Sequence, residues 1–487
     1  MPGLSARCAL TRVPAQCRAW SRQLWGPQVL QHRPQCAGSA EAPATGTTTH
    51  EATAALQERL TNSDGATTSA AAPDSSDSAP PPKFLTRPGL RDARGALMLK
   101  NLTFCELESW CELVGERRQR ARQLWRWLYA DGALIHDISE ATGVANGFSS
   151  AFLELFRQAH ASIDGGMRLE RVHRAADNTR KMVFRLTEGE GAGAAVEAVL
   201  IPIVRSGGAR PRTTLCVSSQ VGCGMNCQFC FTGRLGLCAQ LSAAQIVEQM
   251  VEARRLVAEE AAVGAPDALA PVTNVVYMGM GEPLHNFDAV LASAAIATHE
   301  LGLHFSANKV SVSTVGLVPQ LRALVASSRC QLAVSLHATT DEVRNWLVPV
   351  NRRYPLAELL GALRELFPRS GGRFVLFEYV MLAGVNDSEE DAARFVALAN
   401  DIECKVNLII FNTHAGTRFK PSSADQVQRF RSALIQAGRV CTVRDSRGDD
   451  EMAACGQLGD VGAMGARAPV LRVPPRFQNA LLAAAQG

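Results

Sequence analysis

The spacing of hydrophobic residues changes along the chain, and each change predicts a different kind of structure. Between residues 102 and 157, apolar residues recur at helical spacing, with Trp110, Leu124, Trp127 and Leu128 among them. This segment predicts a small helical domain. From residue 181 the period falls to two, so that 181–186 and 196–202 predict two strands of a small antiparallel extension.

A regular alternation of strand and helix patterns follows the extension. The predicted strands are 212–217, 273–279, 309–314, 331–336, 373–381 and 405–411, and the predicted helices are 242–260, 288–300, 318–328, 340–367, 388–400 and 424–436. Six such units predict an α/β fold with a parallel sheet covered by helices, closed into a partial six-unit (β/α) barrel. A full eight-unit barrel is disfavoured because the alternating elements run out.

The composition of the first 83 residues identifies two segments that precede the folded part of the chain. Residues 1–40 contain five arginines and no Asp or Glu, which is typical of an organellar transit peptide, although a disordered tail is the alternative. We favour the chloroplast over the mitochondrion. Residues 41–83 are rich in Ala, Thr, Ser and Pro and predict a disordered linker. The remaining predicted divisions are 84–165 (helical), 166–205 (β extension), 206–460 (barrel with a C-terminal segment) and 461–487 (tail).

Charge and hydropathy limit the partners. The formal net charge of +4 does not by itself indicate nucleic-acid binding. Arginines cluster on the helical domain, at positions 117, 118, 120, 122 and 126, where they form either a solvated face or an RNA-binding surface. The chain has no apolar run long enough to predict a membrane span.

Three of the fourteen cysteines carry the strongest chemical signal. Cys223, Cys227 and Cys230 have C-x3-C-x2-C spacing and no fourth ligand nearby. A structural zinc site needs four ligands, whereas a 4Fe-4S cluster held by three cysteines leaves one iron open. The loop therefore predicts an open-iron cluster, which is where a radical enzyme holds S-adenosylmethionine (SAM).

Polar residues follow the predicted strands, at the end of a barrel where sites gather. They suit a zwitterionic amino acid and a ribose, and comprise Gly281, Glu282, Ser313, Ser335, Leu336, His337 and Asn412. Two more cysteines stand apart from the cluster loop. Cys216 lies on the first strand and Cys455 lies beyond the barrel, and each alone is as easily a packing residue. If Cys455 folds back over the mouth, one thiolate could be alkylated and the other could resolve the product.

Several stretches resemble one enzyme family. They are 196–202 (VEAVLIP), 214–223 (TLCVSSQVGC), the cluster loop, 278–283 (MGMGEP), 335–338 (SLHA) and 448–457 (GDDEMAACGQ). From about residue 99 to about residue 458 the chain resembles the RlmN-type radical SAM methyltransferases, which methylate C2 of adenosine in large-subunit ribosomal RNA and in transfer RNA. The tail after Asp460 has no assigned counterpart.

The resemblance implies a radical SAM barrel and a role for each candidate residue. Cys223, Cys227 and Cys230 would hold a 4Fe-4S cluster, and the strand-end residues would bind SAM. One SAM would methylate Cys455, and a second would give a 5′-deoxyadenosyl radical. Cys216 would resolve the product by disulfide formation, and Glu197 would accept a proton.

The resemblance also implies partners. They are RNA with an accessible adenosine, an electron donor and a thiol reductant, and we expect a monomer. A longer loop, residues 204–212, makes Glu197 the least secure assignment. Two alternatives stay open: a Cfr-type enzyme that methylates C8 of adenine, and a non-catalytic iron–sulfur protein that binds RNA.

Overall fold

The computed structural model describes residues 82–203, 210–444, 446–459 and 468–478. The predicted transit peptide, 1–40, lies outside the described residues, as do most of the predicted linker and parts of the tail. No helix of the described ranges is long and apolar enough to cross a membrane.

One sheet of ten strands runs through the molecule, in the order β14-β13-β12-β11-β10-β9-β6-β5-β4-β3. Strands β3 to β6 pair antiparallel, and from β6 to β14 every pair is parallel. The strands are β3 (Met167–Arg174), β4 (Arg180–Leu186), β5 (Ala195–Ile203), β6 (Arg212–Cys216), β9 (Val272–Tyr277), β10 (Val310–Thr314), β11 (Gln331–Ser335), β12 (Val375–Met381), β13 (Cys404–Ile410) and β14 (Val440–Arg444).

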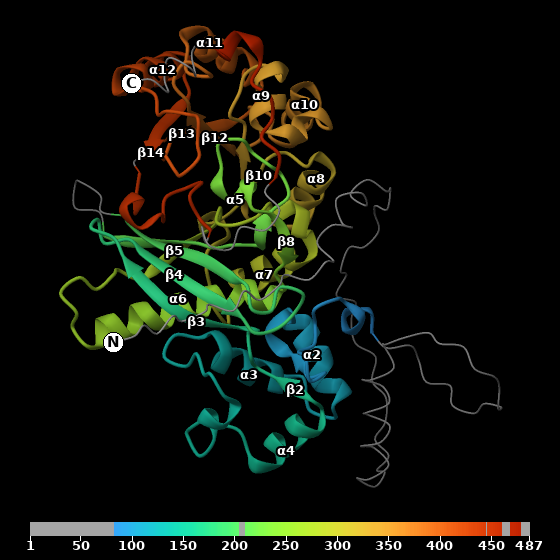
Figure 1. Cartoon of the computed structure of the whole chain (residues 1–487). Coiled ribbons are helices and arrows are strands. Elements are labelled where there is room, and N and C mark those ends of the chain that lie inside the picture. The colour runs from blue at the N-terminus through green and yellow to red at the C-terminus, as the bar shows by residue number, and fades with distance from the viewer. Residues whose placement is uncertain (1–81, 204–209, 445, 460–467, 479–487) are drawn as a thin grey trace, which may run out of the picture.

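Helices alternate with the parallel strands and lie outside them (Figure 1). They are α6 (Ala243–Ala262), α7 (Phe287–Thr298), α8 (Val318–Ser327), α9 (Asp341–Leu347), α10 (Leu356–Leu366), α11 (Glu389–Leu398) and α12 (Ala424–Gln436). The predicted fold class, a partial α/β barrel with an N-terminal helical part and a β extension, is confirmed. The parallel part has one more strand than the six units predicted, because β14 adds to β13.

The predicted single helix over 340–367 is wrong. Helix α9 ends at Leu347, a 3-10 turn follows at Pro349–Arg352, and α10 begins after Pro355. Proline lacks the N–H that a continuous helix would need, so two prolines in seven residues break the helical pattern. Short 3-10 turns also occur at Lys83–Thr86, Leu99–Asn101, Ile138–Ala141, Pro283–Asn286, Ala307–Lys309 and Asp449–Glu451.

A separate hairpin carries the cysteine loop. Strands β7 (Gln220–Cys223) and β8 (Gly236–Gln240) pair antiparallel, and the short helix α5 (Phe231–Arg234) lies between them. The sequence did not predict this hairpin, because β7 and β8 are short and lack a clear alternation.

The N-terminal helices α2 (Phe104–Leu113), α3 (Gln119–Tyr129) and α4 (Ser150–Gln158) form the accessory part of the chain at one end of the molecule, opposite α9 to α12 (Figure 1). A two-stranded parallel pair, β1 (Leu97–Met98) and β2 (Ala161–Ser162), joins its ends. Trp110, Leu124 and Leu128 are buried as the spacing predicts. Trp125 is also fully buried, whereas Trp127 is only partly buried and its Nε1 donates to the Asn146 carbonyl (3.0 Å).

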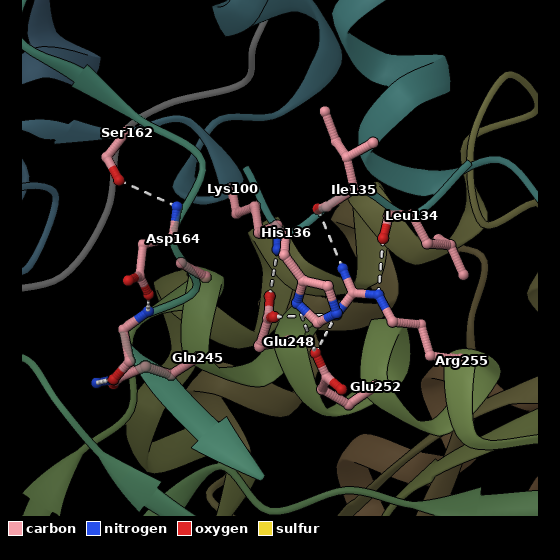
Figure 2. Close-up of polar contacts among 12 residues, drawn as sticks. Lys100, Leu134, Ile135, His136, Ser162, Asp164, Gln245, Glu248, Glu252 and Arg255 are labelled. Atoms are coloured by element: carbon pink, nitrogen blue, oxygen red, sulfur yellow. Dashed lines mark hydrogen bonds and ion pairs between the residues drawn. The ribbon is translucent and has the colours of Figure 1, made fainter. Parts of the chain in front are cut away.

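A buried polar contact joins the accessory part to α6 (Figure 2). Lys100 Nζ donates to Glu248 Oε2 at 2.5 Å, and both side chains are almost fully buried. Arg255, about two turns further along the same face of α6, donates to the carbonyls of Leu134 (2.7 Å) and Ile135 (3.1 Å). Because buried charges are costly to leave unpaired, these contacts fix the accessory helices against the barrel.

Candidate active site

The cysteine loop begins where β7 ends. Cys223 closes the strand, Asn226 takes a left-handed backbone conformation (φ 53°), and Cys230 N donates to the Cys227 carbonyl (3.1 Å). This local winding turns the three thiols toward one another. Burial raises the pKa of each thiol, and at Cys227 the neighbouring Cys223 and Cys230 raise it further.

The donor set fits a 4Fe-4S cluster with an open iron. Three neighbouring thiols, one buried and two partly buried, cannot all ionise without a compensating positive charge, and iron would supply it. A structural zinc site needs four ligands, whereas the loop offers three thiols.

Gly281 and Glu282 follow β9, and Glu282 hydrogen-bonds to Gln220 of β7 and to Val315 after β10. Gly281 has φ 104°, and a Cβ there would lie 2.6 Å from Gln220, so only glycine fits. The Glu282 carboxylate accepts from the backbone N–H of Leu284 (3.0 Å) and of Val315 (2.9 Å). Burial raises its pKa to about 7. The Glu282 N–H donates to Gln220 Oε1 (2.7 Å), so both the side chain and the backbone of Glu282 hold the turns at the mouth together.

Ser313, Ser335, Leu336 and His337 lie on β10 and β11 or directly after β11, as predicted. His337 has a left-handed backbone (φ 57°), and its Nδ1 accepts from Val380 N at 3.0 Å. Burial lowers its pKa to about 3, so the ring is neutral with its proton on Nε2. Its ring centroid lies 4.8 Å from that of Phe229. This ring contact connects the turn after β11 to the cysteine loop.

Asn412 follows β13, and its Nδ2 donates to the Cys455 carbonyl at 3.1 Å. Further bonds hold the same C-terminal segment on α5: Phe231 N donates to Gly456 O (2.7 Å), and Thr232 Oγ1 donates to Leu458 O (2.6 Å). The segment after β14 therefore folds back over the mouth of the barrel, beside the cysteine loop.

Cys216 and Cys455, 239 positions apart in the sequence, line one pocket. Burial raises the pKa of Cys216 to about 12, and the neighbouring Cys455 thiol contributes to the increase. The remaining lining residues come from β5, β13, β14, the turns after β9 and β13, and the C-terminal segment, namely Val199, Ile201, Met278, Ile409, Ile410, Asn412, Arg444, Ser446, Arg447, Ala453, Ala454 and Leu458. The enclosed space is about 20 Å³, room for about one water molecule, so an adenine enters only if the segment moves.

Glu197 lies on β5, on the same strand face as the pocket residues Val199 and Ile201. Its Oε2 accepts from Gly459 N at 2.8 Å, and its Oε1 lies 3.7 Å from Lys181 Nζ. The long loop before β6 does not displace it, because Val199 pairs directly with Cys216 in the sheet register. The carboxylate is thus positioned beside the Cys455 segment.

Two arginines at the site were missed by the sequence analysis. Arg444, at the end of β14, lines the pocket between the two cysteines. Burial lowers its pKa, but Cys455, Glu378 and Cys216 raise it by more, so the guanidinium is held charged. The position of Arg444 at the end of a strand could have identified it, but the sequence did not predict β14.

Arg344 on α9 is fully buried behind the cysteine loop. Its guanidinium donates to the carbonyls of Val315 (2.7 Å), Leu336 (2.9 Å) and Ser335 (3.1 Å), which belong to the turns after β10 and β11. Nothing in the helical pattern of residues 340–367 distinguishes this arginine from a surface one.

Comparison with known proteins places this site in a family. The Radical SAM superfamily model matches residues 217–396. A dual-specificity RNA methyltransferase RlmN from Geotalea uraniireducens is 44% identical over 360 residues, which is 74% of this chain and 96% of the relative. The chain belongs to the RlmN family. A second RlmN, from Geobacter sulfurreducens, is 43% identical and matches 74% of this chain and 91% of its own length.

A solved structure agrees with the RlmN assignment. The crystal structure of a radical SAM methyltransferase from Sphaerobacter thermophilus is 38% identical, with a TM-score of 0.64 over 74% of this chain and 98% of that one. Because the radical SAM and RlmN matches extend through the cysteine loop, the cofactors of this family, a 4Fe-4S cluster and SAM, apply to the chain.

Proposed function

We propose that this radical SAM RNA methyltransferase methylates C2 of adenosine in ribosomal RNA, transfer RNA or both. The observation that supports it best is the meeting of Cys216 and Cys455 in one pocket beside the cysteine loop. A radical enzyme of another type would need the cluster loop but not this pair. The dual-specificity name of the relatives supports two classes of RNA substrate.

The cofactor site follows from the strand ends. Cys223, Cys227 and Cys230 would hold the cluster. SAM would lie across the mouth, against Gly281, Glu282, Ser313, Ser335, Leu336, His337 and Asn412. When bound, the cluster and SAM supply a carbon radical that activates an otherwise inert methyl group.

The chain's own residues carry the methyl group and release it. Cys455 receives a methyl group on its sulfur, in a segment that Asn412 and Thr232 hold over the mouth. Glu197 accepts the proton that leaves C2 once the new carbon–carbon bond has formed. Cys216 then attacks the Cys455 sulfur and breaks the bond from that sulfur to carbon, and a disulfide is left. The proton of the Cys216 thiol completes the methyl group on the base, and the unpaired electron that remains on the adduct would pass back to the cluster.

The proposal requires further partners. An electron donor must reduce the cluster, and a thiol reductant must restore Cys216 and Cys455 after each turnover. RNA would approach the face that carries the pocket, with its target base unpaired or flipped out. We propose that the enzyme acts as a monomer, since one chain supplies every residue of this site.

Replacing Cys216 by alanine tests the proposal. Without the resolving thiol, the RNA base should remain bonded to Cys455 through the methylene carbon, so a protein–RNA adduct should accumulate. The adduct is read by mass spectrometry after nuclease digestion. The double variant C216A/C455A should form none, and an adduct in that variant, or none in C216A, contradicts the proposal.

We also propose that residues 1–40 direct the protein to the chloroplast, on the basis of five arginines and no acidic residue. A fluorescent protein fused after residue 83 should accumulate in plastids of plant cells. Import into mitochondria instead, or retention in the cytosol, would contradict this assignment without affecting the catalytic proposal.

A further inference from the structure

The segment 468–478 crosses the outer side of the cysteine loop, and we refer to it as the strap. Asn226 Nδ2 donates to the Pro469 carbonyl (3.0 Å), and Leu471 N donates to Gln228 Oε1 (2.9 Å). Asn226 and Gln228 are the two neighbours of Cys227 in the sequence. The strap therefore binds the loop on both sides of one of the candidate cluster ligands.

Arg418, from the loop after β13, fastens the same contact. Its Nη2 donates to Gln228 Oε1 (3.1 Å) and to the Leu471 carbonyl (3.0 Å). Gln228 in turn donates from Nε2 to the Asn226 carbonyl (2.8 Å). Hydrogen bonds from charged donors are the stronger ones, so Arg418 contributes most to holding the strap against the cysteine loop.

An apolar contact anchors the far end of the strap. Phe477 is 7% exposed and stacks on Trp346 of α9, with ring centroids 5.4 Å apart and planes 22° apart. Both belong to the buried cluster that includes Cys227, and Leu471 and Val473 pack against it. Val470, between the anchors, is 59% exposed, so only one side of the strap faces the loop.

We propose that the strap shields the cluster that the cysteine loop holds, by closing the outer side of the loop to solvent and small solutes. Hydrogen bonds on both sides of Cys227 and a stacked anchor at Phe477 oppose opening of the loop. From the outer side of the loop, an iron chelator reaches the cluster only after the strap lifts. The inference rests on the proposed function only in assuming that the cluster is bound.

The test measures loss of iron from the full-length protein, reconstituted anaerobically and then mixed with excess EDTA. The decay of the visible absorption band of the cluster reports the rate. Phe477→Ala removes the stacked ring, and Arg418→Met removes the guanidinium bonds to Gln228 and Leu471 but keeps the aliphatic part of the side chain. Each should bind iron as the unchanged protein does and lose it about tenfold faster, the factor expected when one aromatic pair or charged hydrogen bond no longer opposes opening.

Matched controls lie on the outer side of the strap. Val470→Ala and Arg472→Ala change exposed side chains of the same segment and should leave the rate unchanged. Equal rates in all variants overturn the shielding role, as do controls that accelerate as much as F477A. If the unchanged protein binds no iron, the cluster assignment itself fails. Circular dichroism of the cluster-free variants identifies one that does not fold, and the other variant then decides.

Discussion

At the scale of single residues, burial governs the chemistry of the two cysteines that share the pocket. Desolvation raises the pKa of Cys216 to about 12 and raises that of Cys455 as well, while Arg444 opposes both shifts. Before substrate binds, both thiols are therefore protonated at neutral pH and poorly reactive. Ionisation of either thiol at neutral pH therefore requires a change in this buried environment.

The raised pKa of Cys216 gives a test by alkylation. Only the thiolate reacts with iodoacetamide, so in the cluster-free protein the Cys216 rate should rise about tenfold per pH unit between pH 7 and pH 10 without levelling off. Cys238 is exposed and serves as the reference thiol, whose rate should exceed that of Cys216 because the reagent reaches it from solvent. Mass spectrometry of peptides gives both rates. A Cys216 rate that levels off below pH 9 would contradict the burial argument.

Arg344 gives a second test at this scale. Burial lowers its pKa to about 10, so it stays charged at pH 7 while its guanidinium serves three backbone carbonyls. Arg344→Met removes the guanidinium donor from three buried carbonyls, of which, within the described residues, only Leu336 O keeps a second donor, the Ala338 N–H, and should lower the free energy of unfolding by about 3 kcal/mol. Urea unfolding measures the change, with the exposed Arg352→Met as control. Equal stability in the two variants would show that the carbonyls find other donors.

At the scale of elements, the segment after β14 matters most, because it carries Cys455 to a loop more than 200 residues earlier in the sequence. Its two bonds to α5 and one to Asn412 set the position of the sulfur. The sequence predicted the residues of this contact, since motifs identify Cys455 and Asn412. It did not predict how they meet, because hydrogen bonds to backbone carbonyls leave no residue pattern.

Thr232→Val tests this attachment. The substitution keeps the shape of the side chain but removes the hydroxyl that donates to Leu458 O, at a cost of about 1 kcal/mol. Methylation of Cys455 by SAM, measured per iron bound because Thr232 also hydrogen-bonds to the Cys230 thiol, should slow several-fold. Thr298→Val, which removes a hydroxyl bond within α7, is the matched control. An unchanged Cys455 methylation rate in T232V would show that the segment is held by its other contacts alone.

The buried strands were predicted correctly, whereas the edge strand β14 and the break in the helix over 340–367 were not, and each outcome has a physical reason. Strands β9 to β13 are buried runs of Val, Ile and Leu between helical segments, and that pattern predicted them within a few residues. Strand β14 was missed because Val440 and Thr442 are exposed at the edge of the sheet, and the segment has no buried run. The broken helix over 340–367 shows that two prolines outweigh a favourable apolar spacing.

At the scale of the whole molecule, the accessory helices and the barrel are coupled through α6. Lys100 comes from one part and Glu248 from the other, and both are nearly fully buried (Figure 2). RNA bound by the exposed arginines of α3 would therefore be held at a fixed distance from the pocket. This coupling was invisible in the sequence, because a lysine and a glutamate 148 positions apart carry no pairing signal.

Lys100→Met tests the coupling, since it leaves Glu248 buried without its cation. Removing one partner of a buried ion pair costs about 3 to 5 kcal/mol, so the accessory part should become sensitive to limited proteolysis. The iron content should stay unchanged, because the cluster loop lies elsewhere. The double variant K100M/E248L should restore resistance. A single variant as resistant as the unchanged protein would contradict the coupling.

The most direct test of the central claim is nucleoside analysis. The protein, reconstituted anaerobically with iron and sulfide, is supplied with SAM, a reductant and RNA, and the digested RNA is analysed by mass spectrometry. The account predicts 2-methyladenosine from the unchanged protein and none from Cys455→Ala, which should still bind iron. Formation of 8-methyladenosine, or of any methylated adenosine by the C455A variant, would contradict it.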